Sequence, residues 1–74
     1  MANLSWANLS DANLKEAQLS ESNLIRAILT KANLNKADLN SASLVETNLE
    51  GSDLTGSRVY GISAWNLKTN EDTT

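Results

Sequence analysis

The sequence predicts an all-β solenoid, in which the chain winds into coils that stack on one another through backbone hydrogen bonds. Three observations lead to this prediction. Leucine stands at every fifth position from Leu4 to Leu54 without a gap. A small residue lies two positions before each of these leucines. A short polar residue, most often Asn, lies directly before most of them. Together these features define a five-residue unit that repeats along most of the chain.

The five-residue period fits neither regular secondary structure. Each residue of an α-helix turns the chain by about 100°, so leucines five apart step by about 140° and form no apolar stripe. In a straight strand, side chains alternate between the two faces, so an odd period sends successive leucines to opposite sides. A chain that bends once in each unit turns every leucine inward, and a solenoid has this geometry.

The positions within the unit indicate which side chains fill the interior. Leucine fills the middle of each side, and the position two residues earlier also points inward but has room only for Ala, Ser or Thr. Asn or Asp beside the leucine suits a turn, because its side chain bonds nearby backbone amides. Stacked Asn side chains can also form ladders between coils. The predicted structural core consists of Leu4, Leu9, Leu14, Leu19, Leu24, Leu29, Leu34, Leu39, Leu44, Leu49, Leu54 and Val59.

The repeat weakens towards the C-terminus, so the chain is divided into three parts. Residues 1–61 are predicted to form the repeat coil, residues 62–67 an irregular terminal coil or cap, and residues 68–74 a flexible tail. Three glycines stand at the second position after successive repeat centres, where the backbone can require a positive φ; they are Gly51, Gly56 and Gly61.

Two readings of the terminal segment remain open. In strict phase, large Ile62 occupies the small inward site and small Ala64 stands at the centre. In the other reading, Trp65-Asn66-Leu67 restarts the repeat out of phase. Either arrangement closes the apolar column at this end.

Several units carry a specific motif; they are Ala2-Asn3-Leu4, Ala7-Asn8-Leu9, Ala12-Asn13-Leu14, Ala32-Asn33-Leu34 and Ala37-Asp38-Leu39. These units resemble the pentapeptide-repeat proteins, whose consensus is A-(N/D)-L-x-x, and the resemblance covers residues 2–61. It implies a right-handed quadrilateral β-helix with four repeats in each coil, and therefore about three coils. The shorter segment 58–65 resembles the last repeat of some bacterial multidomain proteins.

The outward residues give modest support to four sides. Outward charges pair well whether the coil holds 15 or 20 residues. At an offset of 20 residues, however, the apolar outward residues Ile25, Val45 and Trp65 form one column. The number of sides therefore rests mainly on the family resemblance.

Composition excludes several classes of function. The chain has no Cys and no His, so it offers no disulfide framework, no usual zinc site and no catalytic triad. No apolar run approaches a membrane span, and no signal peptide is evident at the start. Six basic against nine acidic residues give a net charge of −3, which argues against nucleic-acid binding. We expect no enzyme activity, no cofactor, no metal and no small-molecule substrate.

The column of Ile25, Val45 and Trp65, with Ile28 on the neighbouring side, is a possible interaction surface. Contiguous exposed apolar residues often mark a docking site, although β-branched residues also simply favour strand-like backbone. Trp6 falls in one column with Arg26 and Glu46, which allows a cation–π contact and an ion pair. For Trp6 we favour a structural role over membership of a contact surface.

These observations predict a non-enzymatic structural or protein-interaction module that displays rigid flat faces, in a bacterial cytoplasm. Open strand edges make the isolated chain marginally stable or prone to self-association through an end or a side, and an unknown protein is the other partner expected. Two alternatives follow from the resemblance. One is a DNA-mimicking protein that interacts with gyrase, and the other is a scaffold domain of a longer signalling or effector protein.

Overall fold

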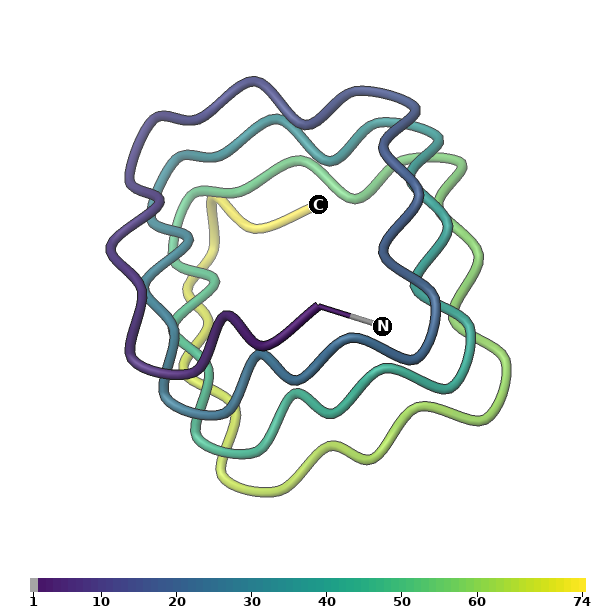
Figure 1. The fold of residues 1–74 in the computed structure, drawn as a ribbon. Helices are drawn as coiled ribbons and strands as arrows, with labels where there is room; N and C mark the ends of the chain where they lie inside the picture. The colour runs from purple at the N-terminus through teal and green to yellow at the C-terminus, as the bar shows by residue number, and fades with distance from the viewer. Residues whose placement is uncertain (1) are drawn as a thin grey trace.

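The computed structural model describes residues 2–74, which wind into a stack of four-sided coils (Figure 1). Each coil holds 20 residues, because every β-bridge is parallel and joins residues 20 apart, from Asn3–Asn23 to Asn48–Lys68. Residues 2–21, 22–41 and 42–61 form three coils, and residues 62–74 form a partial fourth. The bridges stay isolated, so the described residues form no longer strand and no helix.

A tight turn forms each corner of the coil. In the first, the Ala7 amide donates a hydrogen bond to the Leu4 carbonyl at 3.0 Å, and Trp6 has a φ of 66°. Among the described residues, only the second central residue of such a turn has a positive φ, as in a type II turn. The same residue recurs at every fifth position, namely Trp6, Asp11, Glu16, Glu21, Arg26, Lys31, Lys36, Ser41, Glu46, Gly51, Gly56, Gly61 and Asn66. The three glycines therefore occupy positions that need a positive φ, as predicted.

The Asn and Asp side chains beside the leucines hold the chain where it enters each corner. Asn23 Oδ1 accepts a hydrogen bond from the Ile25 amide at 3.0 Å, and Asp38 Oδ1 accepts one from the Asn40 amide at 3.0 Å. These bonds span two residues of one turn, so these side chains act locally rather than as ladders between coils. Such Asx turns explain the preference for Asn and Asp at this position.

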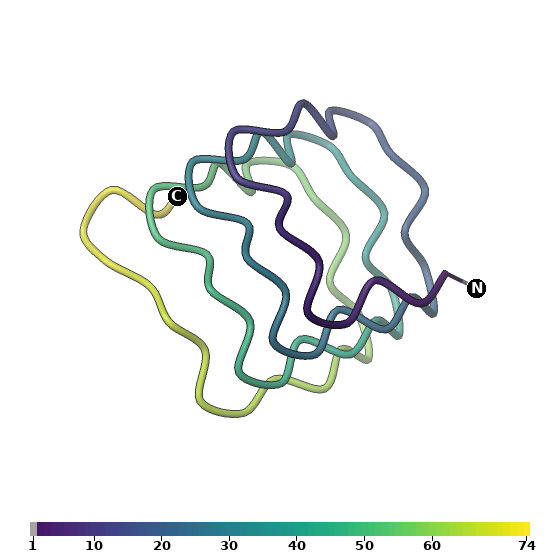
Figure 2. The ribbon, with the colours of Figure 1, turned by 60° about the vertical axis from the view of Figure 1, so that its left-hand side comes forward.

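Backbone hydrogen bonds join the coils. The Asn23 amide donates to the Ala2 carbonyl at 2.8 Å in the coil before it, and the Leu24 amide donates to the Ser43 carbonyl at 2.9 Å in the coil after it. The pattern recurs on each side of the stack. The two ends of the described chain therefore lie at opposite ends of a short rod (Figure 2), and the molecule measures 27 × 22 × 18 Å.

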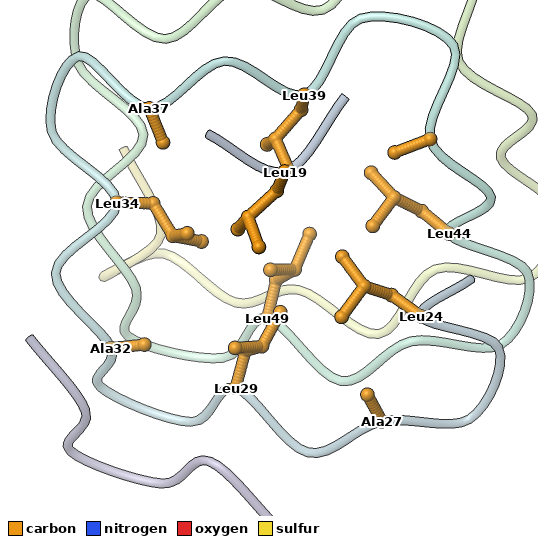
Figure 3. Close-up of a cluster of buried hydrophobic side chains, with 11 residues drawn as sticks. Leu19, Leu24, Ala27, Leu29, Ala32, Leu34, Ala37, Leu39, Leu44 and Leu49 are labelled. Atoms are coloured by element: carbon orange, nitrogen blue, oxygen red, sulfur yellow. The ribbon is translucent and has the colours of Figure 1, made fainter. Parts of the chain in front are cut away.

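The leucines point into the interior of the coil, where they form a single apolar column (Figure 3). The buried members are Leu19, Leu24, Leu29, Leu34, Leu39, Leu44 and Leu49. Small residues share the interior, and the buried hydroxyls of Thr47 and Ser52 donate to the carbonyls of Leu24 and Leu49, each at 2.7 Å. No buried side-chain polar atom among the described residues lacks a hydrogen-bond partner.

The ends of the column are less protected than its middle. Leu4, Leu9, Leu14 and Leu54 are partly buried and pack against the core cluster. Val59 is 46% exposed, so its assignment to the core is wrong. It follows Leu39 in one column, but none of the described residues lies one coil further along to cover it.

The last coil continues in strict phase. Ser63 bridges Ser43 and Lys68 bridges Asn48, so the out-of-phase restart at Trp65 is wrong. Ile62 and Leu67 occupy the small-residue position and pack against the core cluster, whereas Ala64 at the centre is exposed. The large side chains thus close the column from the inward site that Ala fills elsewhere.

Residues 68–74 continue the fourth coil where the sequence predicts a flexible tail. The Thr74 amide donates to the Ser52 carbonyl at 3.0 Å, and the Leu54 amide donates to the Thr74 carbonyl at 2.8 Å. The Gly51 amide donates to Asn70 Oδ1 at 3.0 Å. The C-terminal residues are therefore tied to the third coil. Residues 2–74 contain no helix with the length and apolar character needed to cross a membrane.

Candidate interaction surface

Among residues 2–74, the side chains that can contact other molecules lie on the outside of the coil. No pocket opens among these residues, and no three Asp or Glu side chains come together as a metal site. The outward side chains differ between the four corners.

The corner after Leu4, Leu24 and Leu44 carries the predicted apolar column. Backbone hydrogen bonds fix its register, because the Arg26 amide donates to the Val45 carbonyl at 2.9 Å and the Glu46 amide to the Trp65 carbonyl at 2.7 Å. Ile25 and Val45 are half-buried, and Trp65 is 70% exposed. The structure thus places the three residues in successive coils, one coil apart.

The adjacent positions of the same corner hold a stacked polar and aromatic column. The Arg26 guanidinium carbon lies 4.8 Å from the centroid of the Trp6 ring, and Arg26 Nε lies 2.8 Å from Glu46 Oε1. The cation–π contact and the ion pair predicted for these residues are therefore both present. The two charged side chains remain 48% and 41% exposed, so these contacts orient the side chains and add little stability.

The two columns form one surface, which we call the tryptophan corner; it consists of Trp6, Ile25, Arg26, Val45, Glu46 and Trp65. Ile28 lies beside it on the adjoining side, where it bridges Asn8 and Asn48 and is 37% exposed. Trp6 is 67% exposed and shares the corner with the apolar column. Sequence reasoning gave Trp6 a structural role, although its position directly after the apolar column already placed it at this corner.

Two of the other corners carry only polar, charged or glycine residues. One stacks Asp11, Lys31 and Gly51, and the corner diagonally opposite the tryptophan corner stacks Glu16, Lys36 and Gly56. Within residues 2–74, Arg26–Glu46 is the one ion pair closer than 4.0 Å. An exposed Tyr60 lies beside Val59 near the C-terminal end, and sequence reasoning missed this spot because it assigned Val59 to the core.

The pKa of one carboxyl group, that of Asp53, is lowered. Hydrogen bonds from the Thr55 side chain and backbone amide, with a smaller contribution from Thr74, hold the pKa of Asp53 below its ordinary value of 3.8, against an opposing effect of burial. The Thr55 amide lies 2.9 Å from Asp53 Oδ1. These bonds belong to a turn of the coil, so the shift reflects the fold rather than a catalytic acid.

Comparison with known proteins places this geometry in context. A family model described as "Pentapeptide repeats" matches residues 2–40 and 32–62, in eight copies. No match is found among curated protein sequences.

Solved structures provide further matches. A pentapeptide repeat protein from the Arabidopsis thaliana thylakoid lumen is 25% identical, with a TM-score of 0.83 over 97% of this chain and 53% of its own. One from the cyanobacterium Cyanothece (Rfr23) is 34% identical, with a TM-score of 0.67 over 97% of this chain and 56% of its own. QnrB1, a plasmid-mediated fluoroquinolone resistance protein, is 26% identical, with a TM-score of 0.56 over 93% of this chain and 38% of its own. The chain thus spans little more than half the length of the first two.

Proposed function

Because the chain belongs to the pentapeptide repeat family, we propose that it is a non-enzymatic protein-interaction module whose tryptophan corner docks a protein. The architecture we infer is the right-handed quadrilateral β-helix implied by the sequence motif. The uniform 20-residue register and the four-sided winding in Figure 1 support it.

The observation on which the proposal depends is the concentration of exposed aromatic and aliphatic side chains at one corner. Trp6 and Trp65 are 67% and 70% exposed, and the half-buried Ile25 and Val45 lie in the coils between them. Trp and Arg are enriched at the centres of protein interfaces, because they combine a large apolar surface with hydrogen bonding. Backbone hydrogen bonds between neighbouring coils hold these positions, from the Trp6 amide to the Ile25 carbonyl at 3.0 Å and from the Glu46 amide to the Trp65 carbonyl at 2.7 Å, so little backbone freedom is lost on binding.

A capture experiment tests this function. Immobilised chain is exposed to an extract of the cells that make it, and the captured proteins are compared with those of the double variant Ile25→Ser/Val45→Ser. The matched control is Asn35→Ser/Lys36→Ser, which changes the opposite corner. We expect the corner variant to lose a partner that the control retains. Equal capture by all three chains would contradict the proposal.

The residues favour this function over a DNA mimic that acts on gyrase. Such mimicry requires long acidic columns, whereas here Asp11 and Glu16 precede Lys31 and Lys36 in their columns and the net charge is only −3. In a supercoiling assay, we expect the chain at high micromolar concentration to leave gyrase uninhibited. A scaffold role within a longer protein is compatible with the same docking corner.

A further inference from the structure

The order of side chains along the tryptophan corner is nearly the same when read from either end of the rod. Trp6 lies in the first coil and Trp65 in the partial fourth. Ile25 and Arg26 lie in the second coil, and Val45 and Glu46 lie at the equivalent positions of the third. An aromatic residue therefore stands at each end, and an aliphatic residue beside a charge stands at each inner level. The two inner charges are opposite.

We propose that this corner is an isologous dimer interface, on which a second copy of the chain packs side by side and antiparallel. The two-fold axis lies in the interface, perpendicular to the rod, at the level between the second and third coils. It places Arg26 opposite Glu46 of the partner subunit and Ile25 opposite Val45 of the partner subunit. The first coil of each subunit, with Trp6, then faces the fourth coil of the other, with Trp65 in the neighbouring column. This inference rests on the proposed function, that the corner docks a protein, and identifies the partner.

Charge complementarity selects both the partner and the orientation. A two-fold interface must be complementary to itself, because the same patch is used on both subunits. In the antiparallel arrangement each arginine meets a glutamate, whereas a parallel pair would place Arg26 against Arg26 and Glu46 against Glu46. Like charges across an interface are strongly unfavourable. The ion pair within each chain, 2.8 Å long and still about half exposed, becomes part of a four-charge ring at the centre of the interface.

The available area sets the expected strength of the dimer. A standard interface buries about 800 Å² on each partner, which is roughly one sixth of the 4533 Å² surface of this chain. The corner is one edge of a four-sided rod and is narrow by itself. The adjoining side that carries Ile28 adds to the area that a second copy can contact. We therefore expect a dimer with a Kd in the micromolar range rather than an obligate one.

A charge-swap experiment tests the proposal. Sedimentation velocity over about 10 µM to 1 mM measures the mass of the unaltered chain, of Arg26→Glu and of Glu46→Arg, each checked for an unchanged circular dichroism spectrum. Each single variant faces like charges in its own dimer, so we expect its Kd to rise at least about tenfold. An equimolar mixture of the two variants should regain a dimer, because each chain then meets the opposite charges.

Matched controls separate this effect from net charge. Lys36→Glu and Glu16→Arg make the same charge changes at the same repeat position on the opposite corner, and both should dimerise like the unaltered chain. The double variant Arg26→Glu/Glu46→Arg restores complementarity within one chain and should dimerise by itself. If the mixture stays monomeric while the unaltered chain dimerises, the corner pairing is wrong.

Disulfide cross-linking tests the orientation separately. The chain contains no native cysteine, so only introduced thiols can react. Ser5→Cys places a thiol in the first coil of the corner, and Asn66→Cys places one in the fourth. An antiparallel dimer predicts rapid disulfide formation in a mixture of the two variants and slow formation in either alone. Rapid self-linking of Ser5→Cys alone would overturn the antiparallel arrangement.

The two proposals fail in different ways. If the unaltered chain remains monomeric throughout the concentration series, the self-association inference is overturned. The docking function is then tested by the capture experiment alone. It is supported if Ile25→Ser/Val45→Ser loses a partner that the control retains, and contradicted if it does not. If the corner variants change neither self-association nor capture, both proposals are wrong.

Discussion

The residue at the second central position of each corner adopts a positive φ, and most of these residues are not glycine. L-residues pay about 1–2 kcal/mol for this conformation because Cβ crowds the following carbonyl oxygen. Arg26, Lys31 and Glu46 accept that cost and gain a fixed, outward position for a charged side chain. In the third coil, three of these positions are Gly51, Gly56 and Gly61, which avoid the cost.

Gly56→Ala tests the cost of this conformation. A Cβ at Gly56 would lie 3.2 Å from Lys36 Cγ, and its φ of 73° is unfavourable for alanine. We expect a loss of about 1 kcal/mol in the free energy of unfolding, measured by urea denaturation. Asn35→Ala, at the neighbouring position without a positive φ, is the control and should stay within about 0.5 kcal/mol.

Asp53 predicts a specific pH dependence of stability. Its pKa is lower in the folded chain than the ordinary 3.8 because of the Thr55 hydrogen bonds. The ionised carboxylate therefore stabilises the fold above the unfolded pKa, and this contribution disappears as the pH falls through the lower, folded pKa. Asp53→Asn keeps an acceptor oxygen but cannot titrate. The stability advantage of the unaltered chain over this variant should shrink between about pH 7 and pH 2.5, and an advantage independent of pH would contradict the assignment.

At the scale of one column, a leucine contributes most to the free energy of unfolding where coils cover it on both sides. Leu39 is fully buried, whereas Val59, one coil later in the same column, is 46% exposed. Leu39→Ala should cost about 2–5 kcal/mol, a large share of what a chain of this size can lose. Val59→Ala, as the matched change, should cost about 0.5 kcal/mol. Equal losses in thermal and urea denaturation would show that the terminal coil is covered in solution.

The same contrast explains how much of the fold the sequence predicts. The five-residue period predicts the inward leucines and the turns, because one geometric unit repeats and each copy obeys the same local rule. It cannot predict the exposure of Val59, which depends on whether another coil follows. For residues 62–67 the sequence left two readings open, because a large side chain such as Ile62 fits the small inward site only where the column ends.

The candidate surface shows the same limit. The column of Ile25, Val45 and Trp65 follows directly from the 20-residue offset. The same offset predicts the column of Trp6, Arg26 and Glu46, and the structure confirms its cation–π contact and ion pair. The exposure of Trp6 and Trp65 is not given by the offset, because it depends on which coils cover them. Self-complementarity is a property of the whole corner, so no single repeat reveals it.

For the whole molecule, each coil of a solenoid contacts only its neighbours, so stability depends on how the ends are closed. At the C-terminal end, Ile62 and Leu67 close the column, and residues 68–74, which the sequence predicts as a flexible tail, add a second closure. Thr73 Oγ1 donates to the Leu49 carbonyl at 2.8 Å and accepts from the Gly51 amide at 3.2 Å. These bonds fasten the partial fourth coil over the third, next to Leu54 at the end of the leucine column.

Thr73→Val tests whether this closure stabilises the rod. The change keeps the shape of the side chain but removes both hydrogen bonds to the third coil, together with the local bonds of Thr73 Oγ1 to the Asn70 amide and to Asn70 Oδ1. A typical hydrogen bond contributes about 0.5–1.5 kcal/mol. We expect a loss of about 1–2 kcal/mol in urea denaturation, together with faster amide exchange at Gly51 and Leu54. Thr69→Val, in the same segment but exposed and without a side-chain hydrogen bond in residues 2–74, should leave both measurements unchanged. If the two variants behave alike, residues 68–74 do not help to close the rod, and Ile62 and Leu67 close it without them.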